Sequence, residues 1–207
     1  MFREDNVEQA IIEQLKELGY EYQYAPDIER DYKEAILKDV FYESLYKINK
    51  YITEDIADEV YRKIRNFHAV DLVEANYEFY HMLYAGVEVP IEGDKTFVAK
   101  LIDRDNIENN LFQVLNQYTV IEYKEKRPDV VVFINGIPLI VFELKNAISE
   151  DTTIENAYNQ IKNYQEDIKS LFYYNAFSVI SDGINARIGT ITADFNRFMT
   201  WKYKDGE

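Results

Sequence analysis

The sequence contains no cysteine, only two histidines and no long hydrophobic run. Without cysteine the chain forms neither a disulfide nor a thiolate metal site, and a reducing cytoplasm is the expected location. With His68 and His81 alone, a histidine-rich zinc site is nearly excluded. No apolar stretch approaches the roughly 18 residues that a membrane span requires, and the polar, acidic N-terminus is not a signal peptide. We therefore expect a cytoplasmic protein that makes no membrane contact.

Basic residues are also scarce, with 23 Lys and Arg against 38 Asp and Glu and a net charge of −15. A protein that binds nucleic acid by itself usually has an excess of basic residues, because neutralising phosphates dominates its affinity. This chain therefore either avoids nucleic acid or binds it through a local patch while another component supplies most of the affinity. With 4 prolines and 7 glycines in 207 residues, no stretch is linker-like, which favours one large domain or a core with an appended lobe.

The first part of the chain has the periodicity of helices. Asn6 and Gln9 form a capping box, and apolar residues at helical spacing end at Gly19, which predicts a helix over about residues 6–18. Similar patterns predict helices over 30–49, from a cap at Thr53, and over 70–84. Residues 1–85 are therefore predicted to be a helical lobe, with the first helix packed on the remainder of the chain.

After Gly86 the pattern changes to short alternating strands. Strands are expected in 87–103, late in 109–123, on both sides of Asn135-Gly136, and in 176–182 and 186–191, with a helix over 154–168. Asp182-Gly183 predicts the turn between the last two strands. The fold class is α/β: a mixed sheet flanked by helices over 86–207, with an N-terminal helical elaboration.

The hairpin RPDVVVFINGIPLIVFELKN (127–146) has charged groups at both outer ends, Asp129 at the start and Glu143 and Lys145 at the finish. Because residues two apart share a face of a strand, Glu143 and Lys145 point the same way. Two carboxylates and a lysine at one point suit a magnesium-dependent phosphodiesterase. Carboxylates hold Mg²⁺, the metal polarises the phosphate and acidifies a water, and the lysine offsets transition-state charge.

Strand parity tests this interpretation. A plain two-residue turn at Asn135-Gly136 with a regular ladder would place Asp129 opposite Phe142, on the other face from Glu143. A three-residue connection, a bulge at Gly136 or an equivalent irregularity would bring both carboxylates to one face. We therefore predict such an irregularity. The simpler alternative is that Glu143 and Lys145 form an exposed ion pair at a strand end, with Asp129 merely a strand-start residue.

The string RPD…NGIPLIVFELKN resembles the PD-(D/E)xK nuclease signature, in the form found at the N-terminus of type I restriction enzyme R (motor) subunits. NNLFQVLNQYTV upstream, the Q-x-x-x-Y element in AYNQIKNY, SVISDGINARIGT and the late Trp201 also fit. The resemblance covers residues 86–202 well and the helical lobe more loosely. It implies a restriction-endonuclease-like fold and a DNA endonuclease that uses Mg²⁺, with Mn²⁺ able to substitute, and that reads no sequence itself.

The resemblance also implies roles for single residues. Asp129 and Glu143 match the metal-binding carboxylates and Lys145 the catalytic lysine. Gln160 and Tyr164 match the Q-x-x-x-Y element, which supports activity by helping to place DNA. They are four apart and share a helix face, and the alternative is an amphipathic helix with Tyr164 in the core.

Two further groups are weaker candidates. Glu8, beside the apolar stripe of the first helix, matches a helical glutamate that completes the metal site through water in many such nucleases; otherwise it is a solvated glutamate. Lys124, Lys126 and Arg127 form a basic run before Asp129 that either contacts a phosphate backbone or is a solvated loop.

The sequence has no G-x-x-x-x-G-K-[ST] phosphate loop, whereas R subunits couple cleavage to an ATP-driven motor. We therefore expect either an excised nuclease module or a naturally truncated protein, for which ATP matters only through motor domains. Its expected partners are double-stranded DNA, bound weakly alone, those motor domains, and the methyltransferase and specificity subunits. Two alternatives stay open: a non-catalytic docking module, and another nuclease of the same fold, such as a repair or junction nuclease.

Overall fold

A computed structural model describes residues 4–145 and 153–201, with side chains from residue 6 onward. Within these residues the main sheet has seven strands in the order β1-β4-β7-β8-β9-β10-β11. β1 and β4 are parallel, as are β8 and β9, and the other neighbours are antiparallel. The strands are β1 (Glu21–Tyr24), β4 (Phe112–Asn116), β7 (Val130–Ile134), β8 (Ile137–Leu144), β9 (Phe177–Ser181), β10 (Ala186–Gly189) and β11 (Met199–Thr200). The expected α/β class with a mixed sheet is confirmed.

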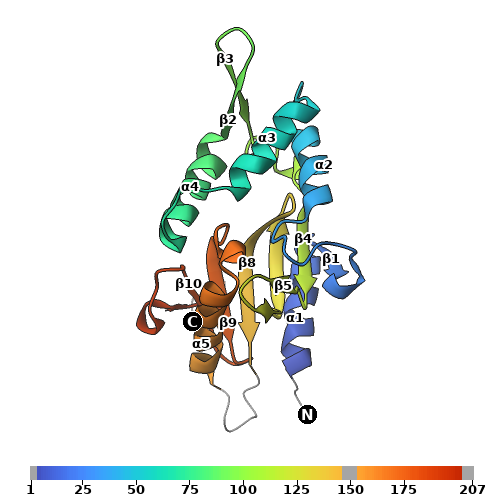
Figure 1. The fold of residues 1–207 in the computed structure, drawn as a ribbon. Coiled ribbons are helices and arrows are strands. Elements are labelled where there is room, and N and C mark those ends of the chain that lie inside the picture. The colour runs from blue at the N-terminus through green and yellow to red at the C-terminus, as the bar shows by residue number, and fades with distance from the viewer. Residues whose placement is uncertain (1–3, 146–152, 202–207) are drawn as a thin grey trace.

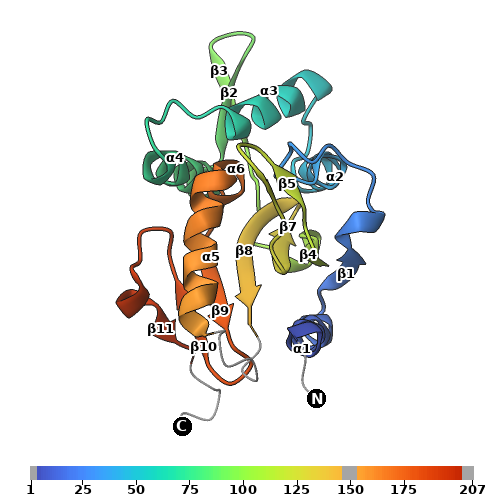
Figure 2. The ribbon, with the colours of Figure 1, turned by 60° about the horizontal axis from the view of Figure 1, so that its bottom comes forward.

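The central strands bury both of their faces. Three helices lie on the sheet layer: α1 (Glu4–Glu17), α5 (Ile154–Asp167) and the short α6 (Lys169–Phe172). On one face Val130 and Phe142 cluster with Ile12 of α1, and on the other Val131 and Val141 belong to the core that includes α5. Adjacent strand residues point to opposite faces, so the two helices sandwich the sheet, as Figure 2 shows.

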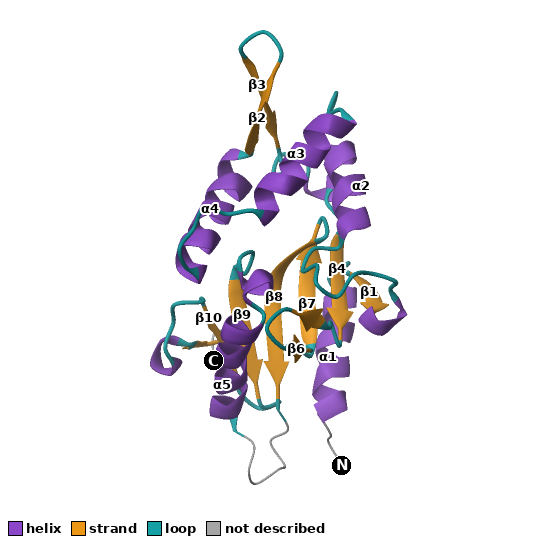
Figure 3. Ribbon diagram, viewed as in Figure 1, coloured by secondary structure: helices purple, strands orange, loops and turns teal. Residues whose placement is uncertain are grey.

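A separate group of helices stands at one end of the sheet, with a β-hairpin projecting beyond it (Figures 1 and 3). This lobe comprises α2 (Lys38–Ile48), α3 (Glu54–Arg65) and α4 (Leu72–Ala85), followed by the hairpin of β2 (Val87–Ile91) and β3 (Lys95–Ala99). The smaller elements are η1 (Ala25–Asp27), η2 (Ile107–Asn109), η3 (Phe195–Arg197) and the pair β5 (Val120–Ile121) and β6 (Glu125–Lys126). The Thr53 and Asp71 side chains cap α3 and α4 by accepting from the main-chain N–H three residues on.

The lobe contacts the turn that joins β7 to β8. The Leu37 N–H donates to the Gly136 carbonyl at 2.9 Å, and the Asn135 amide donates to the Leu101 carbonyl at 2.9 Å. The Tyr118 hydroxyl donates to the Ala35 carbonyl at 3.0 Å. The first two bonds occupy the turn end of the hairpin, and β8 runs from there away from the lobe (Figure 1). Asp129 precedes β7 and Glu143 is near the end of β8, so both lie at the opposite end of the hairpin.

Most predicted elements are present, with differences in the first 50 residues. Thr53 is the predicted cap, but α1 already contains Asn6, so the predicted capping box is wrong. The helix predicted over 30–49 begins only at Lys38, because three successive buried residues before it (Ala35, Ile36, Leu37) cannot share one helical stripe. Strand β1 was not predicted; its sequence Glu-Tyr-Gln-Tyr alternates polar and aromatic residues over only four positions, and all four are exposed.

The substitution Gly136→Ala tests how closely the lobe approaches the hairpin. Gly136 has φ +76°, and a Cβ there would lie 2.7 Å from the Leu37 carbonyl oxygen and 2.8 Å from the Phe41 nitrogen. Both are backbone atoms and cannot move aside, so the free energy of unfolding should fall by about 3 kcal/mol in urea titrations.

Gly93→Ala is the matched control, because Gly93 has φ +78° but no atom within 4 Å of the added Cβ. It should cost only the backbone penalty of about 1 kcal/mol. Equal losses for the two variants would contradict the close contact between lobe and turn.

Candidate active site

The register of β7 against β8 decides where the hairpin's charged ends lie. Ile134 pairs with Ile137 across the two-residue turn, but the register then shifts, and Val132 pairs with Ile140. Leu139 is the extra residue, beside Pro138, which has no N–H to donate to the ladder. The predicted irregularity is confirmed, although it lies at Leu139 and not at Gly136.

The bulge brings the two carboxylates to the same face. Val130 pairs with Phe142, so the next pair outward is Asp129 and Glu143, directly opposite each other. The Asp129 Oδ2 accepts a hydrogen bond from the Leu144 N–H at 2.7 Å. Two acidic side chains from adjacent strands therefore meet at the open end of the hairpin.

Lys145 lies with them, its Nζ 2.6 Å from the Glu143 Oε1. Glu143 is only 2% exposed, whereas Asp129 and Lys145 are half-buried. A buried carboxylate requires compensating charge or hydrogen bonds, and Lys145 supplies both. The three residues predicted from the hairpin are thus together in space.

Helix α5 adds Tyr164 to this group from the face on which it packs. Tyr164 is 3% exposed, and its hydroxyl lies near the Glu143 and Gln160 side chains. Burial raises the pKa of the Tyr164 phenol well above its ordinary value, and the Glu143 and Asp129 carboxylates raise it further. Tyr164 therefore stays protonated at physiological pH and can act as a hydrogen-bond donor to Glu143.

Glu8 is linked to the site through two residues at the end of β4, Asn116 and Gln117. Its Oε1 accepts from the Asn116 amide at 2.6 Å and its Oε2 from the Gln117 amide at 2.9 Å. The Gln117 N–H in turn donates to the Asp129 carbonyl at 2.9 Å. Asn116 and Gln117 had no predicted role; the available signal was two adjacent amides at the end of a largely apolar strand.

The basic run before Asp129 is mostly engaged with α5. Lys124 and Lys126 form ion pairs with Asp167 at 2.9 and 3.1 Å, which ties the β5–β6 segment to the end of that helix. Arg127 is exposed, and the described part of the chain contains no ion pair with it. Of the three predicted phosphate contacts, Arg127 is thus the one that forms no ion pair within the described residues.

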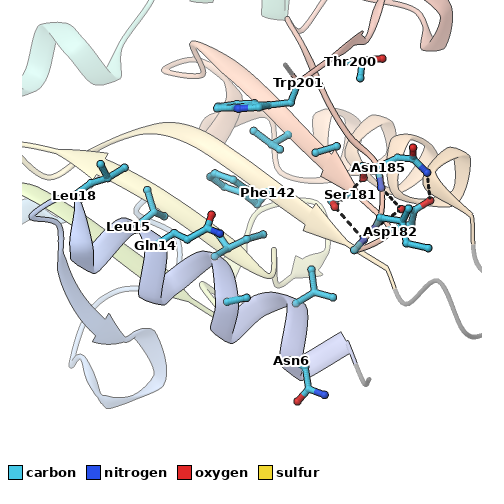
Figure 4. Close-up of a pocket in the computed structure, with 17 residues that line it drawn as sticks. Asn6, Gln14, Leu15, Leu18, Phe142, Ser181, Asp182, Asn185, Thr200 and Trp201 are labelled. Carbon is cyan, nitrogen blue, oxygen red and sulfur yellow. Dashed lines mark hydrogen bonds between the residues drawn. The ribbon is translucent and has the colours of Figure 1, made fainter. Parts of the chain in front are cut away.

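A hollow of about 750 Å³ lies on the other side of the sheet. Its lining is mainly apolar, and Figure 4 shows Leu15 of α1, Leu18 just after that helix, Phe142 of β8 and Trp201 around it. Because Phe142 and Glu143 are neighbours in β8, they face opposite sides. The hollow is therefore separate from the carboxylate–lysine group.

The group defines a class of protein: an α/β protein with a carboxylate–lysine site at the end of a central hairpin. The sequence profile described as type I restriction enzyme R protein N terminus matches residues 1–197. The chain belongs to this family.

Named relatives agree with the family. The chain is 39% identical to a Methanocaldococcus jannaschii protein assigned as the MjaIXP type I restriction enzyme endonuclease subunit, covering 95% of this chain and 20% of the relative. It is 35% identical to the Haemophilus influenzae HindI endonuclease subunit, over 99% of this chain and 21% of that protein. The chain thus spans about a fifth of these relatives. Among the described residues, no helix is long and apolar enough to cross a membrane.

The Asp167 ion pairs predict a pH dependence of stability. Hydrogen bonding with Lys124, then with Lys126, lowers the pKa of the Asp167 carboxyl below its ordinary value. The resulting stabilisation is present above the unfolded-state pKa of about 4 and is lost as pH falls through the lower folded-state pKa.

Asp167→Asn should therefore be less stable than the wild type at pH 7, and this difference should vanish in denaturation curves recorded from pH 5 down to strong acid. Glu92→Gln, in the exposed β2–β3 turn, should leave the pH profile unchanged. A difference that persists undiminished in strong acid would show that the ion pairs do not stabilise the fold.

Proposed function

We propose that this chain is the nuclease module of a type I restriction R subunit, with a PD-(D/E)xK site that hydrolyses DNA phosphodiester bonds in the presence of Mg²⁺ and reads no sequence. The observation that carries the proposal is the Leu139 bulge, which sets Asp129 opposite Glu143 beside Lys145. A regular ladder would have separated the two carboxylates.

The residues present fit a magnesium ion. Mg²⁺ is usually held by one or two carboxylates together with substrate phosphates and waters. Asp129 and Glu143 supply such a donor pair; within residues 4–145 and 153–201 no cluster of three or more His, Cys, Asp or Glu is placed to hold a metal, so two carboxylates are the whole donor set of this kind. When bound, the ion would polarise the scissile phosphate and lower the pKa of a water.

The other side chains support this chemistry. Lys145 places positive charge beside Glu143 and would orient the attacking water and offset charge on the phosphate. Tyr164, whose hydroxyl lies near Glu143 and Gln160, would donate to the Glu143 carboxylate and hold its orientation. Because Tyr164 is buried, its support of activity runs through the carboxylate, and Gln160 and Arg127 are left to face DNA.

The net charge of −15 makes affinity for DNA weak in this module alone. We propose that motor domains present in the longer R subunits, together with methyltransferase and specificity subunits, deliver the DNA. ATP would then be used only by those motor domains. Low intrinsic affinity would also limit cutting away from the assembled complex.

One observation favours a second candidate, a non-catalytic docking module. Glu143 is almost fully buried and is already paired with Lys145, as expected for a structural ion pair. In that case the carboxylates would stabilise the hairpin end and bind no metal.

Nicking of supercoiled plasmid at low salt and high protein concentration separates the candidates. With Mg²⁺ or Mn²⁺ the wild type should nick, and Lys145→Ala and Asp129→Ala should each lower the rate about 100-fold or more. Lys95→Ala, in the exposed strand β3, is the control and should nick like the wild type. If either Lys145→Ala or Asp129→Ala nicked at the wild-type rate, the mutated residue would not take part in the reaction.

If no form nicks, calorimetry with Mn²⁺ decides. Binding that Asp129→Ala abolishes supports a competent site that awaits delivered DNA, and absent binding supports the docking module.

Tyr164→Phe tests the support of Glu143. The ring still fills its place in the core, but the buried carboxylate loses a donor, so the free energy of unfolding should fall by about 1–3 kcal/mol. Plasmid nicking should fall by about tenfold. Tyr77→Phe removes a hydroxyl from a side chain that is 73% exposed and should change neither quantity; equal behaviour of the two variants would argue against the Tyr164–Glu143 bond.

A further inference from the structure

Gln117, the residue directly after β4, lies beside the candidate metal carboxylate. The last pair between β4 and β7 is Asn116 with Val130. Gln117 continues the ladder by one bond, its N–H donating to the Asp129 carbonyl at 2.9 Å. The main chain of Gln117 therefore restrains the main chain of Asp129.

The side chain of the same residue points elsewhere. Its Nε2 donates to the Glu8 Oε2 at 2.9 Å, while the neighbouring Asn116 Nδ2 donates to the Glu8 Oε1 at 2.6 Å. Adjacent residues of a strand normally face opposite sides of the sheet. Both amides reach one carboxylate because the chain leaves strand geometry at Gln117.

This departure shows in the backbone, where Gln117 has φ +56°. A non-glycine residue rarely adopts this left-handed conformation, and strained positions that persist are concentrated at functional sites. In this conformation the Gln117 side-chain amide bonds to Glu8 while the Gln117 main-chain N–H bonds to the Asp129 carbonyl.

The Glu8 end of this arrangement is also held firmly. Asn116 is 4% exposed, and its Oδ1 accepts from the Tyr22 hydroxyl at 3.1 Å. Hydrogen bonds from amides to a charged carboxylate are stronger than bonds between neutral groups. Apolar contacts through Ile12 already hold α1 against the sheet. The two amide hydrogen bonds to Glu8 add a fixed link from α1 to the strand end at Asp129.

We propose that Gln117 is a positioning residue of the nuclease site, which holds Glu8 and Asp129 in a fixed relation through its side chain and its main chain. The proposal rests on the proposed function, because it assumes that Asp129 binds a divalent cation. Gln117 touches no metal itself, and partners that orient a ligand typically alter metal affinity by 10- to 100-fold.

Mn²⁺ calorimetry on the 207-residue chain, without DNA, tests this. Gln117→Met keeps the side-chain length but removes the amide donor, and it should weaken Mn²⁺ binding by about tenfold. Glu8→Ala should weaken it similarly, and the double variant should bind no more weakly than either single one, because both break the same link. Gln117→Gly adopts φ +56° without strain, so it keeps the test valid if the methionine variant does not fold, and it should show the same loss.

Gln14→Met, an exposed glutamine of the same α1 helix, is the matched control and should bind Mn²⁺ like the wild type. Losses that add in the double variant, or wild-type affinity in a folded Gln117→Met or Gln117→Gly, would overturn the role of Gln117. If the role of Gln117 is overturned but Asp129→Ala still abolishes Mn²⁺ binding, the proposed nuclease function stands. Mn²⁺ binding that is unchanged in Asp129→Ala would overturn both the proposed nuclease function and the role of Gln117.

Discussion

One extra residue in strand β8, Leu139, determines the position of the carboxylates in the candidate active site. With Leu139 bulged beside Pro138, the two halves of the hairpin keep a two-residue turn at one end and bring Asp129 opposite Glu143 at the other. The same shift leaves Val130 and Phe142 on the α1 face and Val131 and Val141 on the α5 face. Core packing and site geometry therefore depend on the same register, because moving a strand by one residue exchanges its faces.

The register also sets an electrostatic problem that neighbouring elements solve. Glu143 is taken out of water by the sheet and α5, and an unpaired charge there would be costly. Lys145, just after β8, forms an ion pair with the Glu143 carboxylate, and Tyr164 of α5 lies near it. A site built in this way is held ready by the fold, and its carboxylates are oriented before any ligand arrives.

The two ends of the hairpin have different tasks. At the turn end, Gly136 allows the backbone of the helical lobe to approach within contact distance, so the lobe and the sheet act as one support. At the open end, Gln117 joins α1 to the end of β4, and Asp167 ties the end of α5 to the β5–β6 segment. The acidic composition of the chain is compatible with the proposed division of labour, in which longer R subunits and their partners bring the DNA.

The sequence by itself determined the elements whose causes are local. The Asn135-Gly136 turn, the Thr53 cap, the helix around Tyr164 and the alternating apolar runs follow from backbone preferences and periodicity over a few residues. The grouping of Asp129, Glu143 and Lys145 was also predicted from the sequence. The need for an irregularity between them follows from counting residues along two paired strands.

Only the tertiary structure decided where that irregularity lies, because a bulge at Leu139 and one at Gly136 satisfy the same parity. It also decided that Lys124 and Lys126 pair with Asp167 and that Gln117 takes a left-handed backbone to link Glu8 with Asp129. The Lys124 and Lys126 ion pairs join residues about 40 apart in the chain, and the hydrogen bond between Gln117 and Glu8 joins residues 109 apart. Their energies come from pairing and burial in the assembled fold, which no local pattern of residues records.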